Sequence, residues 1–152
     1  MDRTQKTEIV NMCMVCRGDQ VLVLDKVHKE WGGYTFPGGH VEREEAFADA
    51  VIREVYEETG LTISAPMLCG VKDWVNEDGS RYLVLLYKAH RFSGELTASR
   101  EGEVFWMPLE ELLSDEEHIS LDMKDLIKVF TRDDLSEFFY YQEEKQWKYQ
   151  LK

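Results

Sequence analysis

Residues 53–61 read Arg53-Glu54-Val55-Tyr56-Glu57-Glu58-Thr59-Gly60-Leu61. In a helix, residues three and four apart are neighbours on the surface, so Glu54, Glu57 and Glu58 share one patch. Carboxylates this close repel one another and raise one another's pKa. Their oxygen atoms suit a hard divalent cation such as Mg²⁺ or Mn²⁺. The run therefore predicts a helix that binds a divalent cation.

The helix that carries this run also has an apolar side. A helical wheel places Phe47, Ala50 and Val51 on the same arc as the three glutamates, and Asp49, Arg53 and Tyr56 on the other side. Most charge runs form solvated helix faces. Here the acidic patch borders the face expected to be buried, where carboxylates must be paired or bind metal. The wheel favours the metal-binding interpretation over a solvated face.

Glycines bound this helix on both sides. We expect the helix to run from Glu44 or Ala46 to Thr59 and to end at Gly60 in the left-handed conformation. The run Pro37-Gly38-Gly39 predicts a turn that brings the backbone close to the helix entrance. Gly39 is expected to be needed there for both its small size and its backbone angles.

Residues 39–61 resemble the Nudix box. That motif is Gly, five residues, Glu, seven residues, Arg-Glu, an aliphatic, any residue, Glu-Glu, any residue, Gly and an aliphatic. Its fixed places are filled by Gly39, Glu45, Arg53, Glu54, Val55, Glu57, Glu58, Gly60 and Leu61. Seven specified identities match by chance with a probability on the order of 10⁻⁸ per starting position. Trp31 and the residues from Phe36 also resemble the family's approach to the box, whereas Glu44 stands where many members have glycine.

The resemblance implies a Nudix-type α/β/α sandwich with a mixed sheet, and a Mg²⁺ site in which Mn²⁺ can substitute. The implied metal ligands are the Gly38 carbonyl, Glu54, Glu57 and Glu58. Periodicity without the resemblance predicts only mixed α and β structure.

The resemblance also implies catalytic roles outside the ligand set. Arg53 resembles the residue that orients a catalytic carboxylate, and Glu45 the outer acid of the box. Family members often add a glutamate from a later loop as ligand or base. Glu101 is the first candidate and Glu103 the second, and the alternative is that both are surface acids.

Composition agrees with one catalytic domain over residues 1–152. The chain is 43% hydrophobic, enough for a real core at this length. The N-terminus lacks the apolar stretch of a signal peptide and no apolar run reaches membrane-spanning length, which predicts a cytoplasmic protein without membrane contact. The net charge of −12 disfavours nucleic acid as a partner, and a small nucleotide is the expected substrate.

The rest of the chain alternates strand-like and helical segments. Strands are expected over 9–16, 20–27, 67–75, 82–90 and 103–107, helices over 109–113 and 121–130, a loop over 29–35, and a hairpin turn over 76–80. The aromatic tail, 138–141 and 147–151, predicts a terminal hairpin. That hairpin packs either on the domain or on a second copy of the chain in a homodimer.

The cysteines and histidines do not form a metal motif. Cys13 and Cys16 have the spacing of a zinc pair, but no second pair exists and a strand turns them to opposite faces, which favours buried structural thiols. Cys69 has the same interpretation. Of the four scattered histidines only His40 lies inside the box, where it either approaches substrate or is exposed.

Aromatic residues near the box are candidates for holding a nucleotide base. Trp31 and Tyr34 precede the box, and Trp74 and Tyr82 flank the predicted hairpin turn. A base stacked on an aromatic ring gains about 1–3 kcal/mol. We expect at least one of the four to contact the base, with Gly39 near the phosphates; the alternative for each is a place in the core.

These features predict a Nudix pyrophosphohydrolase of the MutT-like branch, which cleaves a phosphoanhydride bond in a nucleoside triphosphate or related nucleoside diphosphate derivative. Oxidised nucleotides such as 8-oxo-dGTP are included, although only Asn11 and Asn76 are asparagines, so the late asparagine with which the type protein reads guanine is missing. Two alternatives are an RNA 5′-end pyrophosphohydrolase, which needs a basic strip, and an inactive Nudix-fold sensor, which has no reason to keep the glutamates.

Overall fold

The computed structural model describes residues 1–27 and 33–152. Its elements in chain order are β1 Thr7–Arg17, β2 Gln20–Lys26, β3 Gly33–Thr35, α1 Phe47–Thr59, β4 Leu61–Ser64, β5 Met67–Val75, β6 Arg81–Ala89, β7 Arg91–Gly94, β8 Gly102–Pro108, α2 Leu109–Ser114, α3 Leu121–Thr131, β9 Glu137–Glu143 and β10 Gln146–Leu151.

A mixed sheet forms the centre of the fold. Within the described residues it has eight strands, in the order β10-β9-β5-β6-β1-β2-β3, with β8 also paired to β2. The β1–β6 and β5–β9 pairs are parallel, and the others are antiparallel. A second, two-stranded sheet joins β4 to β7. The predicted mixed sheet is confirmed.

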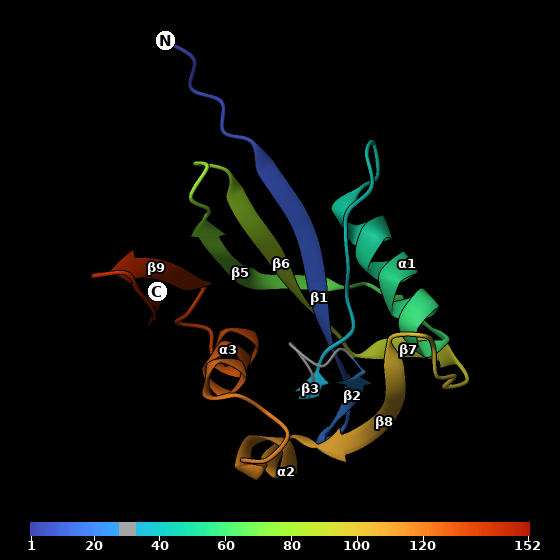
Figure 1. The fold of residues 1–152 in the computed structure, drawn as a ribbon. Coiled ribbons are helices and arrows are strands. Elements are labelled where there is room, and N and C mark those ends of the chain that lie inside the picture. Colours follow the sequence, from blue (N-terminus) through green and yellow to red (C-terminus); the bar gives the residue numbers. More distant parts are fainter. Residues whose placement is uncertain (28–32) are drawn as a thin grey trace.

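Helices cover both faces of the sheet (Figure 1). Alternation along β1 turns Cys13 and Val15 into the core shared with α1, and Met14 and Cys16 into the core shared with α3. This is the expected α/β/α arrangement. It also confirms that Cys13 and Cys16 are buried thiols on opposite faces, free of a disulfide. Across the described ranges, no helix has the length and apolar character needed to cross a membrane.

Helix α1 ends as predicted and begins slightly later. Gly60 has φ +78° and its N–H donates to the carbonyl of Tyr56, which closes the last turn. Ala50 and Val51 are fully buried, as the wheel indicates. Phe47, placed on the same arc, is 45% exposed, because it is the first residue of α1 and the buried contacts of the helix start only at Ala50.

Three short strands were not predicted. Gly33–Thr35 falls in the segment predicted as a loop, yet it is β3 and pairs with β2. Strands β4 and β7 pair only with each other, at places such as Ile63 beside Phe92. Segments of three or four residues are too short to show a clear alternation, and their pairing depends on distant partners. Trp31 lies outside the described residues.

The C-terminal hairpin packs on the domain. Strand β9 pairs with β5 and buries Phe138 completely, so the hairpin extends the main sheet. Two tyrosines then tie it to α3: the Tyr140 hydroxyl donates to Asp122, and the Tyr149 hydroxyl donates to Asp125 at 2.6 Å. The first of the two expected placements of the tail is the one observed.

Candidate active site

The loop before α1 lies along the free part of β1 like an added strand. The Asn11 N–H donates to the Gly39 carbonyl and the Cys13 N–H to the Pro37 carbonyl, both at 2.8 Å. A Cβ on Gly38 would stand 2.0 Å from the Asn11 carbonyl oxygen. Position 38 therefore accepts only glycine if the loop is to keep its contact with β1.

Gly39 makes room for a side chain instead of a backbone. A Cβ there would stand 2.4 Å from the Cδ and Oε2 atoms of Glu54, which reaches the loop from α1. Gly39 is not among the residues with positive φ. The expectation that its backbone angles require glycine is therefore wrong, and the reason for glycine is the space taken by the Glu54 carboxylate.

Glu58 is the most buried glutamate of the run. Glu58 is only 7% exposed, and its Oε2 accepts a hydrogen bond from the Gly38 N–H at 3.2 Å. Burial, with a smaller contribution from the charges of Glu101 and Glu54, raises the pKa of Glu58 to about 7, against the lowering effects of the Gly38 N–H and Lys26. No ion pair within the described part of the chain neutralises this carboxylate.

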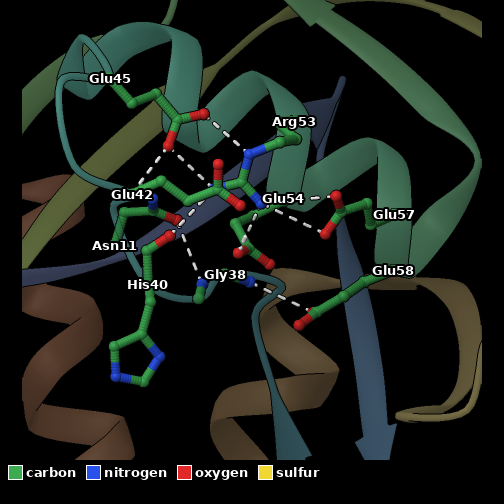
Figure 2. A network of polar contacts seen from close by, with 10 residues as sticks. Asn11, Gly38, His40, Glu42, Glu45, Arg53, Glu54, Glu57 and Glu58 are labelled. Atoms are coloured by element: carbon green, nitrogen blue, oxygen red, sulfur yellow. Dashed lines mark hydrogen bonds and ion pairs between the residues drawn. The ribbon is translucent and has the colours of Figure 1, made fainter.

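Arg53 lies at the centre of the polar network in Figure 2. Its guanidinium donates to both oxygens of Glu45, at 2.7 and 2.9 Å, to Glu54 Oε1 at 2.9 Å, and to the His40 carbonyl at 3.0 Å. The pair with Arg53 lowers the pKa of Glu45 to about 2. Arg53 thus holds the loop and Glu54 in one arrangement, and a weaker contact at 3.3 Å reaches the more exposed Glu57.

A divalent cation fits this donor set chemically. The residues described in the structure contain no ready cluster of three or more His, Cys, Asp or Glu side chains spaced to hold a metal ion. The carboxylates of Glu54, Glu57 and Glu58 nevertheless come from one side of α1, and Glu58 is buried without a neutralising partner. Hard oxygen donors around an uncompensated buried carboxylate are what Mg²⁺ or Mn²⁺ prefers.

Of the two later glutamates, Glu101 is the one near Glu58. It lies just before β8, its carbonyl accepts the Val27 N–H at 3.1 Å, and its charge raises the pKa of Glu58. Glu103 lies in register with Asp25 on β2 and is exposed. The structure therefore brings Glu101 towards the α1 glutamates and keeps Glu103 in the strand ladder.

Glu44, the visible departure from the box, has φ +64°. A left-handed backbone of this kind favours glycine, which is the residue that many members of the family have here. Glu44 adopts the glycine conformation without changing a candidate ligand.

The aromatic candidates fall into two separate groups. Tyr34 stacks on His118, with centroids 4.4 Å apart. Trp74 stacks on Tyr82, also at 4.4 Å, and meets Tyr140 edge-on. Trp31 is outside the described residues. The structure thus does not place the candidates in one pocket.

A shallow hollow adjoins the second aromatic group. Its volume is about 230 Å³ and its lining residues are Val75, Asn76, Glu77, Phe139, Tyr140, Tyr141, Gln142 and Trp147. None of the α1 glutamates lines it. The His40 side chain is also away from the α1 glutamates. It is 65% exposed, and its Nε2 lies 2.7 Å from the Glu8 carboxylate on β1.

Sequence reasoning missed Asn11. This residue is 4% exposed on β1, and its Oδ1 accepts the Gly39 N–H at 3.2 Å. The available signal was a carboxamide among apolar residues, on the same strand face as Cys13 and Val15. Polar groups in such positions need a hydrogen-bonding partner.

The fold and the arrangement of the box agree with comparisons to known proteins. The family model of the NUDIX domain matches residues 6–130. The chain belongs to the Nudix hydrolase family, whose members are hydrolases that act on acid anhydrides.

Individual relatives place it among MutT-like proteins. It is 33% identical over 108 residues to the uncharacterised Nudix hydrolase YvcI of Bacillus subtilis, covering 68% of this chain and 67% of that protein. Phosphatase NudJ of Escherichia coli K12 is 23% identical over 111 residues, 71% of this chain and 72% of that one. The crystal structure of a mutator MutT protein from Bacillus halodurans is 31% identical with a TM-score of 0.77, covering 95% of this chain and 97% of that one.

Proposed function

We propose that this protein is a divalent-metal-dependent pyrophosphohydrolase of the MutT-like branch. It acts in the cytoplasm as one domain over residues 1–152, and cleaves a phosphoanhydride bond in a nucleoside triphosphate or related nucleoside diphosphate derivative. The resemblance of residues 39–61 to the Nudix box and the MutT-like relatives support this class of reaction. The leaving group is chosen outside the box, so the proposal names the bond and not the base.

One observation carries the proposal. Glu54 and Glu58 leave α1 in the direction of the same loop, so that one carboxylate lies against Gly39 and the other accepts the Gly38 N–H. Gly39 is required by the close approach of Glu54, whereas Gly38 is required by its contact with the Asn11 carbonyl on β1. Carboxylates beside a glycine backbone can bind a metal ion close to that backbone. Phosphate oxygens bound to the metal ion would then also approach the backbone, which has no side chain to block them.

Glu54, Glu57, Glu58 and the Gly38 carbonyl would hold Mg²⁺, or Mn²⁺ in its place. A divalent cation bound there would polarise the phosphorus–oxygen bond and lower the pKa of a bound water. The carboxylates of Glu54, Glu57 and Glu58 would supply most of the negative charge that neutralises such a cation.

The remaining residues of the site orient these groups. Arg53 holds Glu54 from one side through its 2.9 Å contact and is itself held by both oxygens of Glu45. A residue fixed in this way keeps the Glu54 carboxylate in one orientation without taking part in bond cleavage. Glu101, close to Glu58, is proposed as the late ligand or base of the site.

For the base, we propose contact with at least one of Trp31, Tyr34, Trp74 and Tyr82. Tyr34 stacks on His118 and Trp74 stacks on Tyr82, so one face of each ring is already covered. Alanine replacement of the residue that holds the base should raise KM more than it lowers kcat, because stacking acts equally on bound substrate and transition state. If all four variants keep the wild-type KM while folded, the aromatic segment 138–147 is the next place to test.

A hydrolysis panel with Mg²⁺ tests the reaction class. It should include unmodified and oxidised nucleoside triphosphates, sugar nucleotides and capped RNA, with release of phosphate or pyrophosphate as the readout. We expect turnover of nucleotides, none after chelation, and recovery with Mg²⁺ or Mn²⁺.

A pair of variants tests the glutamates. Glu58→Gln should lower kcat by about 10²-fold or more, the usual scale for losing a catalytic group, while the fold survives. Glu110→Gln, an exposed glutamate at the start of α2, is the matched control and should keep wild-type turnover. Undiminished turnover in chelated enzyme, or in Glu58→Gln, would contradict the metal mechanism.

A further inference from the structure

Lys72 on β5 carries an ammonium group that has no acceptor. The residue is half-buried, and among the residues that the structure describes its Nζ forms no ion pair and no hydrogen bond. Burial lowers the pKa of Lys72, and the nearby charge of Asp122 opposes that shift. Asp122 itself accepts the Tyr140 hydroxyl. The three N–H donors of the ammonium are therefore left without an oxygen or nitrogen to accept them.

Aromatic rings border this ammonium. Its Nζ lies 5.2 Å from the ring centroid of Tyr140, 5.7 Å from that of Phe138 and 6.0 Å from that of Trp74. Tyr140 and Phe138 belong to β9, beyond residues 6–130 that match the family model. Ring faces are negative, so they attract the cation, but they would repel a phosphate. The rings therefore favour a flat, uncharged group with an acceptor oxygen as the partner of Lys72.

The ammonium is not closed off from a ligand. Within the described ranges, the fully enclosed side-chain atoms that lack a partner are Asn11 Nδ2 and Asp73 Oδ1, and Lys72 Nζ is not one of them. An atom of a bound molecule can therefore reach Nζ.

Lys72 also lies in line with the loop that precedes α1. It is in register with Val84 on β6, Val84 is in register with Val10 on β1, and Val10 forms a β-bridge with His40. Three strand spacings, or about 14 Å, thus separate Lys72 from His40. His40 directly follows Gly39, which we expect near the phosphates. A nucleotide with its phosphates at this loop can span that distance with its base.

We propose that Lys72 is a specificity-determining residue whose ammonium donates to a carbonyl oxygen of the substrate base. This role rests on the proposed function and narrows its substrate class to nucleotides with an oxopurine base, such as hypoxanthine or guanine. Adenine presents an amino group in place of that oxygen. The amino group would meet the ammonium donor to donor and leave the charge without an acceptor.

Inosine triphosphate and adenosine triphosphate are a matched pair of substrates, because their bases differ chiefly in this carbonyl oxygen and amino group. We expect the wild-type kcat/KM to favour inosine triphosphate by about 10-fold or more, the scale of one charged hydrogen bond. Lys72→Met, of similar length, should reduce this preference to about twofold or less, mainly through a higher KM for inosine triphosphate. Lys72→Arg keeps a cation with N–H donors and should retain part of the preference.

Lys88→Met is the matched control. Lys88 is also half-buried, on the neighbouring strand β6, but its Nζ donates to the Phe130 carbonyl at 3.0 Å. This variant should lose stability and keep the preference. Lys72→Met gives up no hydrogen bond, so its melting temperature should not fall. A Lys72→Met enzyme that keeps the wild-type preference, or a wild-type enzyme that has none, would overturn the role of Lys72. A lower melting temperature with an unchanged preference would mean that Lys72 serves only to hold the hairpin.

Binding of nucleoside monophosphates tests the contact without hydrolysis. In protein labelled with ¹³C-lysine, the ε-CH₂ signals of Lys72 and Lys88 are assigned by their absence in Lys72→Arg and Lys88→Met. Inosine monophosphate should shift the Lys72 signal, adenosine monophosphate should shift it less, and the Lys88 signal should stay in place.

The two measurements fail separately. If inosine monophosphate does not shift the Lys72 signal, the proposed contact is wrong, whatever the enzyme hydrolyses. If the signal shifts but no nucleotide is cleaved, the contact stands and the proposed function is the part that fails. The binding measurement uses the wild-type protein, so it still decides should Lys72→Met not fold.

Discussion

Gly38 and Gly39 are neighbours that need to be glycine for different physical reasons. The added Cβ at Gly38 meets a backbone oxygen at 2.0 Å, which cannot move without parting the loop from β1. The added Cβ at Gly39 meets only the end of the Glu54 side chain, which can rotate away. The first position is therefore tied to the fold and the second to the function.

This difference predicts that Gly39→Ala lowers kcat by about 10- to 100-fold, because a displaced Glu54 carboxylate loses the orientation that catalysis uses, with a melting temperature close to wild type. Gly79→Ala is the control. Gly79 lies in open space with φ +82°, so alanine there should lower the melting temperature and leave kcat alone. A Gly39→Ala enzyme that keeps wild-type kcat would refute the functional reason for this glycine.

Glu44 predicts a substitution in the opposite direction. A residue other than glycine at φ +64° carries backbone strain. Glu44→Gly relieves that strain but adds conformational entropy to the unfolded chain, so we expect a net rise in the free energy of unfolding of only about 0.5–1 kcal/mol. Denaturant unfolding measures it, with Glu42→Gly, two residues earlier and not among the residues of positive φ, as the control that should not stabilise.

At the scale of elements, helix α1 and its loop were predictable and the small strands were not. The positions of Gly60 and of the three glutamates follow from local rules of helix geometry, which need no distant partner. Strands β3, β4 and β7 exist only because distant segments pair with them, and Tyr34 is placed by a stack on His118 far along the chain. Asn11 escaped notice for the same reason, since its partner Gly39 belongs to another element.

The hairpin of β9 and β10 is attached to α3 through tyrosine–aspartate bonds, which gives an element-scale prediction. Tyr149→Phe removes the bond to Asp125 and should lower the free energy of unfolding by about 1 kcal/mol at pH 7, a discounted value for a partly exposed charged hydrogen bond. This should lower the melting temperature by about 2–4 °C.

The same bond has a pH signature. The hydrogen bond to Asp125 raises the pKa of Tyr149 to about 12, from an ordinary value of 10.0. The folded state therefore holds the phenol proton more tightly than the unfolded state. The stabilisation is complete below about pH 10 and is lost as the pH rises towards 12, so the difference between Tyr149→Phe and wild type should shrink over that range. A constant difference would mean that the bond is not made.

The whole molecule is strongly acidic, and this affects its encounter with an anionic substrate. A net charge of −12 repels a nucleotide at low ionic strength, where the Debye length is about 30 Å at 0.01 M and about 8 Å at 0.15 M. At constant free Mg²⁺ we expect kcat/KM to rise by roughly two- to fivefold over that range. A fall in kcat/KM with added salt would instead indicate a basic strip that attracts substrate. Such a result would favour the alternative function, an RNA 5′-end pyrophosphohydrolase.

The position of β1 has a consequence for how the molecule reaches its native state. Its parallel pairing brings Thr7 beside Arg81, so the strand docks only after a long crossover that includes α1 has closed. The hairpins β5–β6 and β9–β10 need only nearby residues and form on a microsecond scale, whereas non-local parallel pairing is slow. The loop with Gly38 and Gly39 rests on the other edge of this same strand. A newly synthesised chain thus acquires its glutamate site in the slowest step of folding, and the recovery of activity after dilution from denaturant should lag behind the return of helix and hairpin signals.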